Sequence, residues 1–392
     1  MKVVFFSNFM NHHQLPFCLA MNKLLNGEFI FVANEKIPDE RIKLGYENMN
    51  DKYSFVLTAY ANEEKKQEAF FLADVCDVAI IGSAPDEYIV NRLEKGKLTF
   101  RYSERFYKGK YNNVFYIPKM WFWNFRKNRK FRNKPLYMLC ASAYTAYDCT
   151  KFGDFKEKTY KWGYFPEVKT QDINRLFQIK NKTPKKTILW VGRLIKWKHP
   201  EVAIFVAEKL KSQGIDFQCI LIGNGAMEDE LNELIEHKNL TDCVKMLGAM
   251  SPDKVRQYME EANVFLFTSD SNEGWGAVLN EAMNSCCSIV ASHAIGSVPF
   301  LIKDKKNGLI YRDGDIEDAS DKVLYLLKNE EERYCLGVNA YNTLIDEWNA
   351  DIAAERFIVL SKELIINKEC NKYKSGPCSR AGILKNGWYK GE

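Results

Sequence analysis

Phe265-Leu-Phe-Thr-Ser-Asp-Ser-Asn-Glu273-Gly-Trp-Gly-Ala-Val-Leu-Asn-Glu281-Ala-Met283 is the stretch from which the rest of the chain can be understood. An apolar run of strand length, residues 264–267, leads into a polar, turn-forming segment, and a helical stretch begins after two glycines that flank a tryptophan. This order predicts a buried strand, a loop and a helix. In open α/β sheets, ligands bind beyond the carboxyl ends of the strands, where such a loop lies.

Two carboxylates in this stretch are candidates for ligand binding. Glu273 lies in the predicted loop, and Glu281 lies one turn into the predicted helix. The glycines let a ligand approach the backbone, and the first amide groups of a helix attract anions. The alternative is an ordinary strand-to-helix turn with two solvated carboxylates, and the stretch by itself leaves both interpretations open.

Length and composition predict two domains and a mildly basic protein. The usual domain size of ~150 residues gives two domains for a chain of 392 residues, and 46% hydrophobic residues suffice for sizeable cores. A net charge of +5 suits an anionic ligand or a membrane surface. It does not require nucleic acid, which we do not expect as a partner.

Cysteine and hydropathy patterns predict a cytoplasmic protein without a metal centre. The eleven cysteines include no Cys-x-x-Cys pair, which indicates free thiols in a reducing compartment. Neither cysteines nor histidines cluster at metal-ligand spacing, so we predict no metal site. No apolar run approaches the ~20 residues of a membrane-spanning helix, so any membrane contact is expected to be peripheral, at the inner face.

Strand and helix candidates alternate along the chain, which predicts parallel sheets with crossover helices. We expect a first α/β domain over residues 1–165, with apolar strand candidates at residues 2–6, 29–32, 53–57, 78–81 and 136–141. A polar, Lys-rich linker is predicted over residues 166–186, and a second α/β domain over 187–350. Residues 351–392 are expected to form a helix and a tail that could pack back on the first domain.

Four loops of the second domain follow predicted strands, so all four are expected at the same edge of one sheet. Arg193 can grip a phosphate through two N–H groups, and Lys198 adds a mobile charge. The Gly223-Asn-Gly225 turn offers backbone that a ligand can approach, and the backbone of Met246-Leu-Gly248 could hydrogen-bond a flat base. With the two glutamates, these loops suit a nucleotide diphosphate. Singly, each has an ordinary alternative, a solvated basic turn or a tight turn.

The second domain resembles the donor-binding domain of retaining glycosyltransferases of family four, which have the GT-B fold of two facing Rossmann-like domains. Val191–Lys198 resembles the Gly-Arg-Leu…Lys motif of that family, and Leu221–Gly225 resembles its glycine turn. Glu273–Glu281 matches its Glu-seven-Glu motif, and Asn307–Ile310 resembles its late Asn-Gly-Leu segment. The resemblance covers residues 187–328.

The resemblance implies roles for these residues. Arg193 and Lys198 would bind the donor diphosphate, Glu281 the ribose, and Glu273 would face the donor sugar. The donor would be a nucleotide sugar linked to UDP or GDP, used as a co-substrate, with no cofactor and no required metal. The remaining predicted donor contacts are Gly192, Gly223, Gly225, Met246, Leu247, Gly274, Trp275, Gly276 and Ala277.

The first domain departs from the family pattern. The usual Gly-Gly turn after the first strand is replaced by Asn8–Gln14, and no histidine lies between His13 and His199, although many members place one near the reacting sugar. His13 and Glu104 are the candidates for that catalytic role. Each also has an ordinary alternative, a histidine pair at a helix start and a surface charge pair. Phe300 stands where a family loop often has Glu.

Residues 121–134, Trp-Phe-Trp-Asn-Phe-Arg-Lys-Asn-Arg-Lys-Phe-Arg-Asn-Lys, combine five aromatic and six basic residues without an acid. Such a mixture suits the interface of an anionic membrane. The alternative is a helix with its aromatic side chains in the core and a solvated basic face. Spacing alone does not separate the two interpretations.

We therefore expect a retaining glycosyltransferase that moves a sugar from a nucleotide-sugar donor to a glycan or lipid-linked acceptor, in cell-surface polysaccharide synthesis. The first domain would bind the acceptor. A sugar-nucleotide epimerase of similar shape and a catalytically idle nucleotide-binding scaffold are the alternatives. A dinucleotide oxidoreductase is disfavoured, because no Gly-x-Gly-x-x-Gly follows the first strand.

Overall fold

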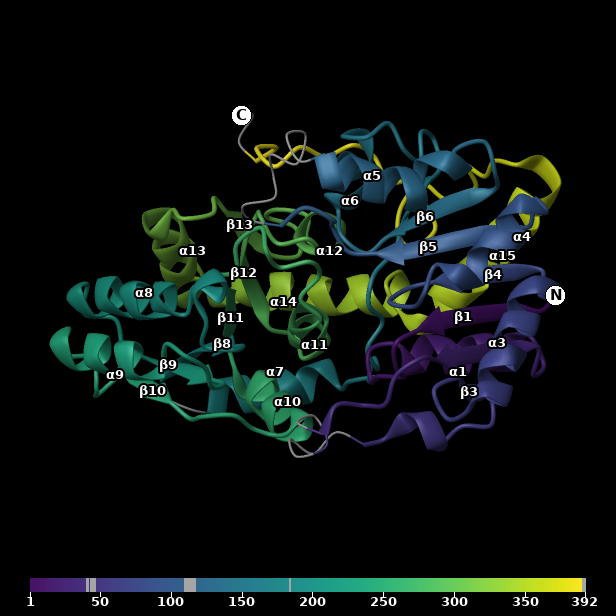
Figure 1. The fold of residues 1–392 in the computed structure, drawn as a ribbon. Coiled ribbons are helices and arrows are strands. Elements are labelled where there is room, and N and C mark those ends of the chain that lie inside the picture. The colour runs from purple at the N-terminus through teal and green to yellow at the C-terminus, as the bar shows by residue number, and fades with distance from the viewer. Residues whose placement is uncertain (40–41, 43–46, 109–117, 183–184, 390–392) are drawn as a thin grey trace. The chain divides into compact units, whose positions relative to one another are not determined.

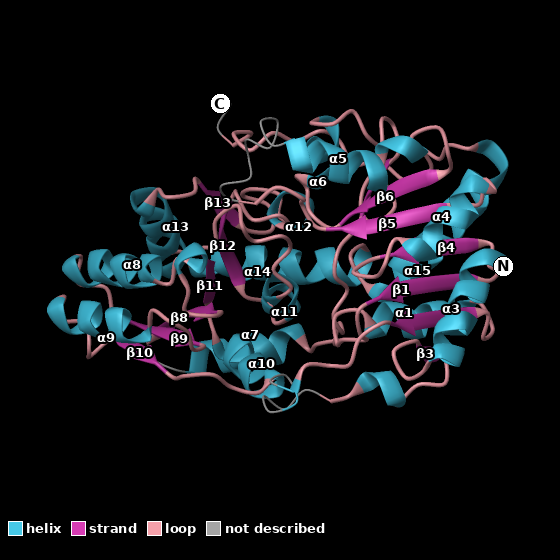
Figure 2. Cartoon of the chain, in the orientation of Figure 1, coloured by secondary structure: helices cyan, strands magenta, loops and turns pink. Residues whose placement is uncertain are grey.

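The chain forms two compact units in a computed structural model that describes residues 1–39, 42, 47–108, 118–182 and 185–389. One unit comprises Met1–Glu167 and Trp348–Lys385, and the other comprises Val168–Glu347 and Asn386–Glu392. Each unit contains a parallel β-sheet covered by helices (Figure 1, Figure 2). Among the described residues, no helix combines the length and the apolar character that crossing a membrane requires.

The sheet of the first unit has the strand order β3-β2-β1-β4-β5-β6-β7, and every neighbouring pair is parallel. The order reverses between β1 and β4, which is the kind of point where such sheets bind ligands. The strands are β1 (Val3–Ser7), β2 (Phe29–Ala33), β3 (Val56–Thr58), β4 (Val78–Ile81), β5 (Thr99–Ser103), β6 (Leu136–Cys140) and β7 (Thr159–Lys161).

Helices pack on both faces of this sheet. Helices α3 and α4 contribute to the core on one face, while α1 and α15 pack together on the other. The ring of Phe357, fully buried in α15, lies 6.1 Å from Phe17 and 5.0 Å from Phe100. The C-terminal helix is therefore part of the first unit's core. The helices are α1 (Leu15–Leu24), α3 (Glu63–Val75), α4 (Glu87–Glu94), α5 (Pro118–Lys127), α6 (Thr145–Thr150) and α15 (Ala350–Asn367).

The sheet of the second unit has the order β10-β9-β8-β11-β12-β13, again parallel throughout. This is the order of a Rossmann fold, with its switch point between β8 and β11. The strands are β8 (Lys186–Val191), β9 (Phe217–Ile222), β10 (Val244–Met246), β11 (Val264–Phe267), β12 (Ser288–Ser292) and β13 (Leu309–Tyr311). The helices are α7 (Ile173–Lys182), α8 (Glu201–Ser212), α9 (Glu228–His237), α10 (Pro252–Glu261), α11 (Val278–Asn284), α12 (Val298–Leu301), α13 (Ile316–Lys328) and α14 (Glu330–Asp346).

Two elements differ from the sequence-based expectation. Residues 166–186, expected as a linker, contain helix α7, which is packed into the second unit. Buried Lys180 donates to the carbonyl oxygens of Met259 at 2.9 Å and Ala262 at 2.6 Å, so the helix can bury a charge. Strand β5 was not among the predicted strands, because its sequence, Thr-Phe-Arg-Tyr-Ser, lacks an apolar run.

Candidate functional site

The loops after β8 and β11 are fastened to each other at the switch point of the second sheet. The backbone amide of Asp270 donates to the carbonyl of Trp197 at 3.0 Å, and the Thr268 hydroxyl donates to the carbonyl of Lys198 at 2.6 Å. The Trp190 indole donates to the Thr268 hydroxyl at 2.8 Å. These bonds fix the loop after β8, which carries Arg193 and Lys198, relative to the loop after β11, which carries Glu273.

Lys198 and Glu273 form an ion pair between these two loops. The Glu273 side chain is buried, and its Oε2 also accepts from the Ser269 hydroxyl at 3.2 Å. The Lys198 ammonium lies 4.8 Å from the centre of the Trp197 ring. A buried carboxylate is stable only with a partner of opposite charge and with hydrogen bonds. The structure thus brings together two residues that the sequence assigned separately, to the diphosphate and to the donor sugar.

Arg193 is exposed at the same edge. Its guanidinium carbon lies 5.6 Å from the Trp197 ring centre, so the basic groups of Arg193 and Lys198 both lie close to this indole. A guanidinium that packs against an aromatic face is held in one orientation, and its N–H groups remain available to donate to a ligand. Its predicted contact with a diphosphate is compatible with this placement.

Glycines join the loop after β8 to the loop after β9. A Cβ on Gly223, where φ is +146°, would lie 1.7 Å from the carbonyl oxygen of Gly192. A Cβ on Gly225, where φ is +157°, would lie 2.4 Å from the carbonyl oxygen of Leu194. The Leu194 amide donates to the Asn224 carbonyl at 2.8 Å. Backbone packing alone therefore requires glycine at 223 and 225, and a ligand contact there stays a prediction.

The predicted contact at the end of β10 is partly occupied within the unit. The Leu247 amide donates to the carbonyl of Leu221 at 3.0 Å, and the Gly223 amide donates to the carbonyl of Gly248 at 2.9 Å. The Leu247 N–H group is therefore already used. Met246, partly buried at the end of the strand, packs against the core cluster of the unit.

Residues 274–277 connect Glu273 to the start of α11. Trp275 is fully buried, its indole donates to the Asn280 side chain at 2.9 Å, and its ring lies 6.3 Å from Phe300. A Cβ on Gly276, where φ is +80°, would lie 2.4 Å from the Phe267 ring. The Trp275 side chain is thus part of the core. A donor contact at Trp275 would have to come from its backbone, and the same holds for Gly274 and Ala277.

Glu281 projects from the short helix α11. Burial raises the pKa of its carboxyl group, and the charge of Arg256 lowers it by a smaller amount. The Arg256 guanidinium donates to the Glu281 carbonyl at 2.9 Å and to the Asn284 side chain at 3.1 Å. A carboxylate in this setting gains from hydroxyl donors that favour its ionised form, as the predicted ribose contact would supply.

Sequence analysis did not identify a charged cluster beside Lys198. The His199 ring lies 2.8 Å from a Glu201 oxygen and 3.5 Å from an Asp270 oxygen. Hydrogen bonds that the ring donates to the carboxylates of Asp270 and Glu201 raise the pKa of His199 to about 10, so the ring is a cation at neutral pH. The backbone of His199 is left-handed, with φ of +50°. The sequence signal available was the His-Pro-Glu that follows Lys198, but Asp270 is distant along the chain.

The two catalytic candidates of the first unit are linked through Tyr164. The His13 ring stacks on Tyr164 at a centroid distance of 5.9 Å, and the Tyr164 hydroxyl donates to Glu104 at 2.7 Å. The second Glu104 oxygen accepts from Lys108 at 2.8 Å. These residues follow β1, β5 and β7, so they share the carboxyl edge of the first sheet. Tyr164 is a member of this group that the sequence did not indicate.

Sequence comparison finds one family model and several curated proteins that are similar to part of this chain. Residues 172–343 match the model of the family described as Glycosyl transferases group 1. The amylovoran biosynthesis glycosyltransferase AmsK of Erwinia amylovora is 31% identical over 182 residues, 45% of this chain and 44% of that protein. The poly(ribitol-phosphate) alpha-N-acetylglucosaminyltransferase of Staphylococcus aureus is 27% identical over 200 residues, 48% of this chain and 40% of that protein. The chain thus spans less than half the length of these curated relatives.

Solved structures share the fold. Alr3699/HepE of Anabaena, in complex with UDP, gives a TM-score of 0.68 at 16% identity and covers 92% of this chain and 98% of its own. TarM of S. aureus, in complex with fondaparinux, alpha-GlcNAc-glycerol and UDP, gives a TM-score of 0.58 at 18% identity and covers 76% of this chain and 59% of its own. The predicted fold class, GT-B with two Rossmann-like parallel-sheet domains, is confirmed.

Proposed function

We propose that the protein is a retaining glycosyltransferase that transfers a sugar from a nucleotide-sugar donor to a glycan or lipid-linked acceptor in cell-surface polysaccharide synthesis. The observation that carries the proposal is the Lys198–Glu273 pair at the β8/β11 switch point, inside a segment that matches group 1 glycosyl transferases. The names of the relatives, which include a poly(ribitol-phosphate) transferase, support the polysaccharide context.

The donor would bind at the carboxyl edge of the second sheet. Negative charge grows on the leaving diphosphate as the glycosidic bond breaks, and fixed positive groups stabilise that charge without reorganising. Arg193 and Lys198 would supply the positive groups, Glu281 would accept from the ribose, and Glu273 would face the sugar. Because these protein groups balance the phosphate charge, no metal is required in this proposal.

Incubation with donors tests the proposal and separates it from its alternatives. Purified protein would be offered UDP- and GDP-linked sugars with and without a lipid or glycan extract. A transferase releases UDP or GDP and labels the extract, whereas an epimerase changes the donor sugar without an acceptor. An idle scaffold binds the nucleotide without turnover, and that outcome would reject the enzymatic proposal.

We also propose peripheral contact with an anionic membrane through α5. The exposed fractions of Phe122 and Phe125 are 64% and 53%, and the Arg126 guanidinium lies 5.7 Å from the Phe122 ring. In the part of residues 121–134 that the structure describes, the buried positions are Asn124, Asn128 and Phe131. The exposed Phe122 and Phe125 on α5 are the observation that supports the interfacial interpretation. The side chains of Trp121 and Trp123 lie outside the described residues.

Vesicle sedimentation tests the membrane proposal. Replacing Phe122 and Phe125 by Ser should weaken binding to phosphatidylserine vesicles, whereas Phe71→Ser on α3, where the ring is 63% exposed, should leave it unchanged. Wild-type protein that ignores anionic vesicles at low salt would reject the proposal.

A further inference from the structure

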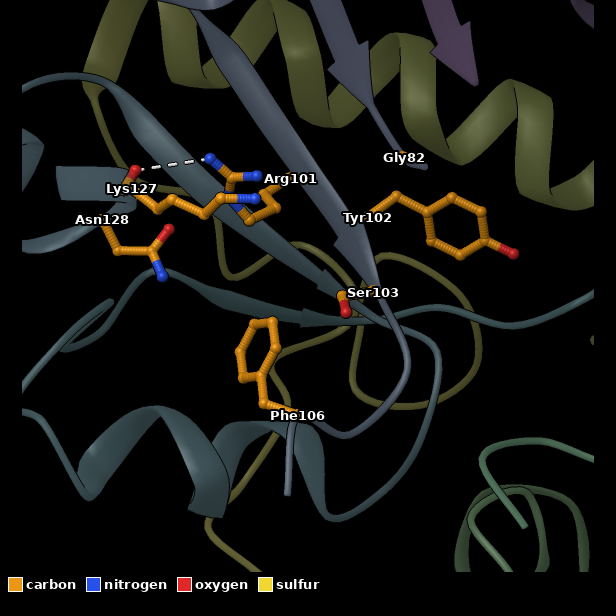
Figure 3. A pocket seen from close by; sticks show the side chains of 7 residues that line it. All are labelled: Gly82, Arg101, Tyr102, Ser103, Phe106, Lys127 and Asn128. Carbon is orange, nitrogen blue, oxygen red and sulfur yellow. Dashed lines mark hydrogen bonds between the residues drawn. The ribbon is translucent and has the colours of Figure 1, made fainter. Parts of the chain in front are cut away.

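A small pocket opens at the carboxyl ends of β4 and β5 in the first unit, beside the β1/β4 switch point. Its volume is about 210 Å³, and Figure 3 shows its lining side chains, with the Tyr102 ring pointing away from Arg101 and Asn128. The other lining residues are Gly82, Arg101, Ser103, Phe106, Lys127 and Asn128. We call it the β4–β5 pocket.

The β4–β5 pocket carries a net positive charge. Arg101, which is 7% exposed, donates to Asp86 at 2.8 Å and to the carbonyl of Lys127 at 3.3 Å. The Lys127 ammonium lies 2.9 Å from the other Asp86 oxygen. Burial by itself would raise the pKa of Asp86, but Arg101 and Lys127 bring it below its usual value, so the carboxylate is ionised. Two cations against one carboxylate leave one positive charge.

Two buried polar atoms of the pocket residues have no hydrogen-bond partner. They are Nε of Arg101, a donor, and Oδ1 of Asn128, an acceptor. The Asn128 amide group is fixed because its Nδ2 donates to Asn124 at 2.9 Å. Unsatisfied buried groups are rare in native proteins and each calls for a partner. A ligand that offers both an anionic oxygen and a hydroxyl group would match this donor and this acceptor.

Size and shape restrict that ligand to one small unit. Pockets that enclose drug-sized ligands have volumes of ~300–1,000 Å³, so 210 Å³ suits a single sugar ring or a charged group. The Phe106 ring forms an apolar wall against which the C–H face of a sugar could lie. Charge, hydrogen bonding and size together describe an acidic monosaccharide.

We propose that the β4–β5 pocket binds an acidic sugar residue of the acceptor, one that carries a carboxylate or a phosphate group. This inference rests on the proposed function, because it assigns the pocket to the acceptor of the transfer reaction. Arg101 would bind the anionic group, Asn128 would accept from a ring hydroxyl, and Phe106 would pack against the ring.

Binding of simple sugars to the full chain tests the proposal. Saturation-transfer NMR and calorimetry would compare D-glucuronate, glucose 6-phosphate and glucose. We expect the acidic sugars to bind at least tenfold more tightly than glucose, and their ratio tells a carboxylate from a phosphate preference. Equal affinity for all three sugars would overturn the proposal.

Ser103 provides a matched pair of variants. Ser103→Asp adds a carboxylate to the pocket and should weaken binding of the acidic sugar at least tenfold, whereas Ser103→Asn, of the same size and uncharged, should change it less than threefold. If both variants and the wild type bind the acidic sugar equally well, the sugar binds outside the β4–β5 pocket and the proposal is wrong. Arg101→Gln should behave as Ser103→Asp does, with thermal denaturation as the check of folding.

Nucleotide binding separates this proposal from the proposed function. UDP titration reports on the second unit and should be unchanged in the Ser103 variants. If UDP binds and sugar is transferred, but acidic sugars bind no better than glucose, the pocket assignment fails and the transferase proposal stands. If acidic sugars bind in an Arg101-dependent way but no donor is turned over, the pocket stands as a binding site and the transferase proposal fails.

Discussion

Lys198 and Glu273 form an ion pair, and we expect substitutions at the two positions to have different effects on UDP binding and on kcat. Lys198→Ala should weaken UDP binding and lower turnover about 100-fold, the usual effect of losing one stabilising donor. Glu273→Gln releases Lys198 from its partner, so it should keep or strengthen UDP binding while it lowers kcat. Calorimetry and steady-state kinetics measure both. Lys196→Ala, an exposed lysine of the same loop, is the control, and an equal loss there would contradict the assignment.

His199 makes stability depend on pH. Its folded-state pKa of about 10 lies above the ordinary value of 6.5, so its stabilising contribution is complete below pH 6.5 and is lost as pH rises towards 10. We expect a loss of only ~1 kcal/mol, because the side chain is 35% exposed and solvent screens its ion pairs. Urea unfolding at pH 6 and pH 10 should show this loss in the wild type and a smaller one in His199→Gln. Parallel behaviour of the two proteins would refute it.

Among the elements, the glycine turn after β9 should tolerate no side chain. Gly223→Ala places a Cβ 1.7 Å from a carbonyl oxygen, so the backbone must move, and we expect a loss of roughly 3 kcal/mol or more in the free energy of unfolding. Gly214→Ala, with φ of +70° and nothing within 4 Å of the new Cβ, isolates the cost of backbone conformation and should lose only ~1 kcal/mol. Similar losses in both variants would show that the close contact relaxes freely.

The elements also show how far sequence reasoning reaches. The sequence pattern located the loops after β8, β9 and β11, because these strands contain apolar runs that end at glycines or polar turns. The loop after β10 was located by Gly248, which follows the short strand. The same reasoning missed β5 and α7, because each buries a charge, Arg101 or Lys180. The partners of those charges lie 15 and about 80 residues away. The His199 cluster was missed for the same reason, since Asp270 approaches it only in the folded unit.

For the whole molecule, we expect activity without a divalent metal. The proposed diphosphate site has Arg193 and Lys198 as positive partners, which can stabilise the phosphate charge. Turnover measured in excess EDTA should therefore equal turnover in its absence. Activity that disappears in EDTA and returns with Mg²⁺ or Mn²⁺ would show that the charge balance needs an ion.

The return of α15 to the first unit has a consequence for biosynthesis. Phe357 completes a core begun by Phe17 and Phe100, but the ribosome adds it roughly 200 residues after the last strand of that sheet, a delay on the order of 10–40 s at ~5–20 residues per second. The second unit, by contrast, has all the strands of its sheet within Val168–Glu347, and only Asn386–Glu392 joins it later. The part translated later can thus acquire its native packing first, while the earlier part waits with an apolar sheet face uncovered. A nascent chain in that interval is a natural client for a ribosome-associated chaperone.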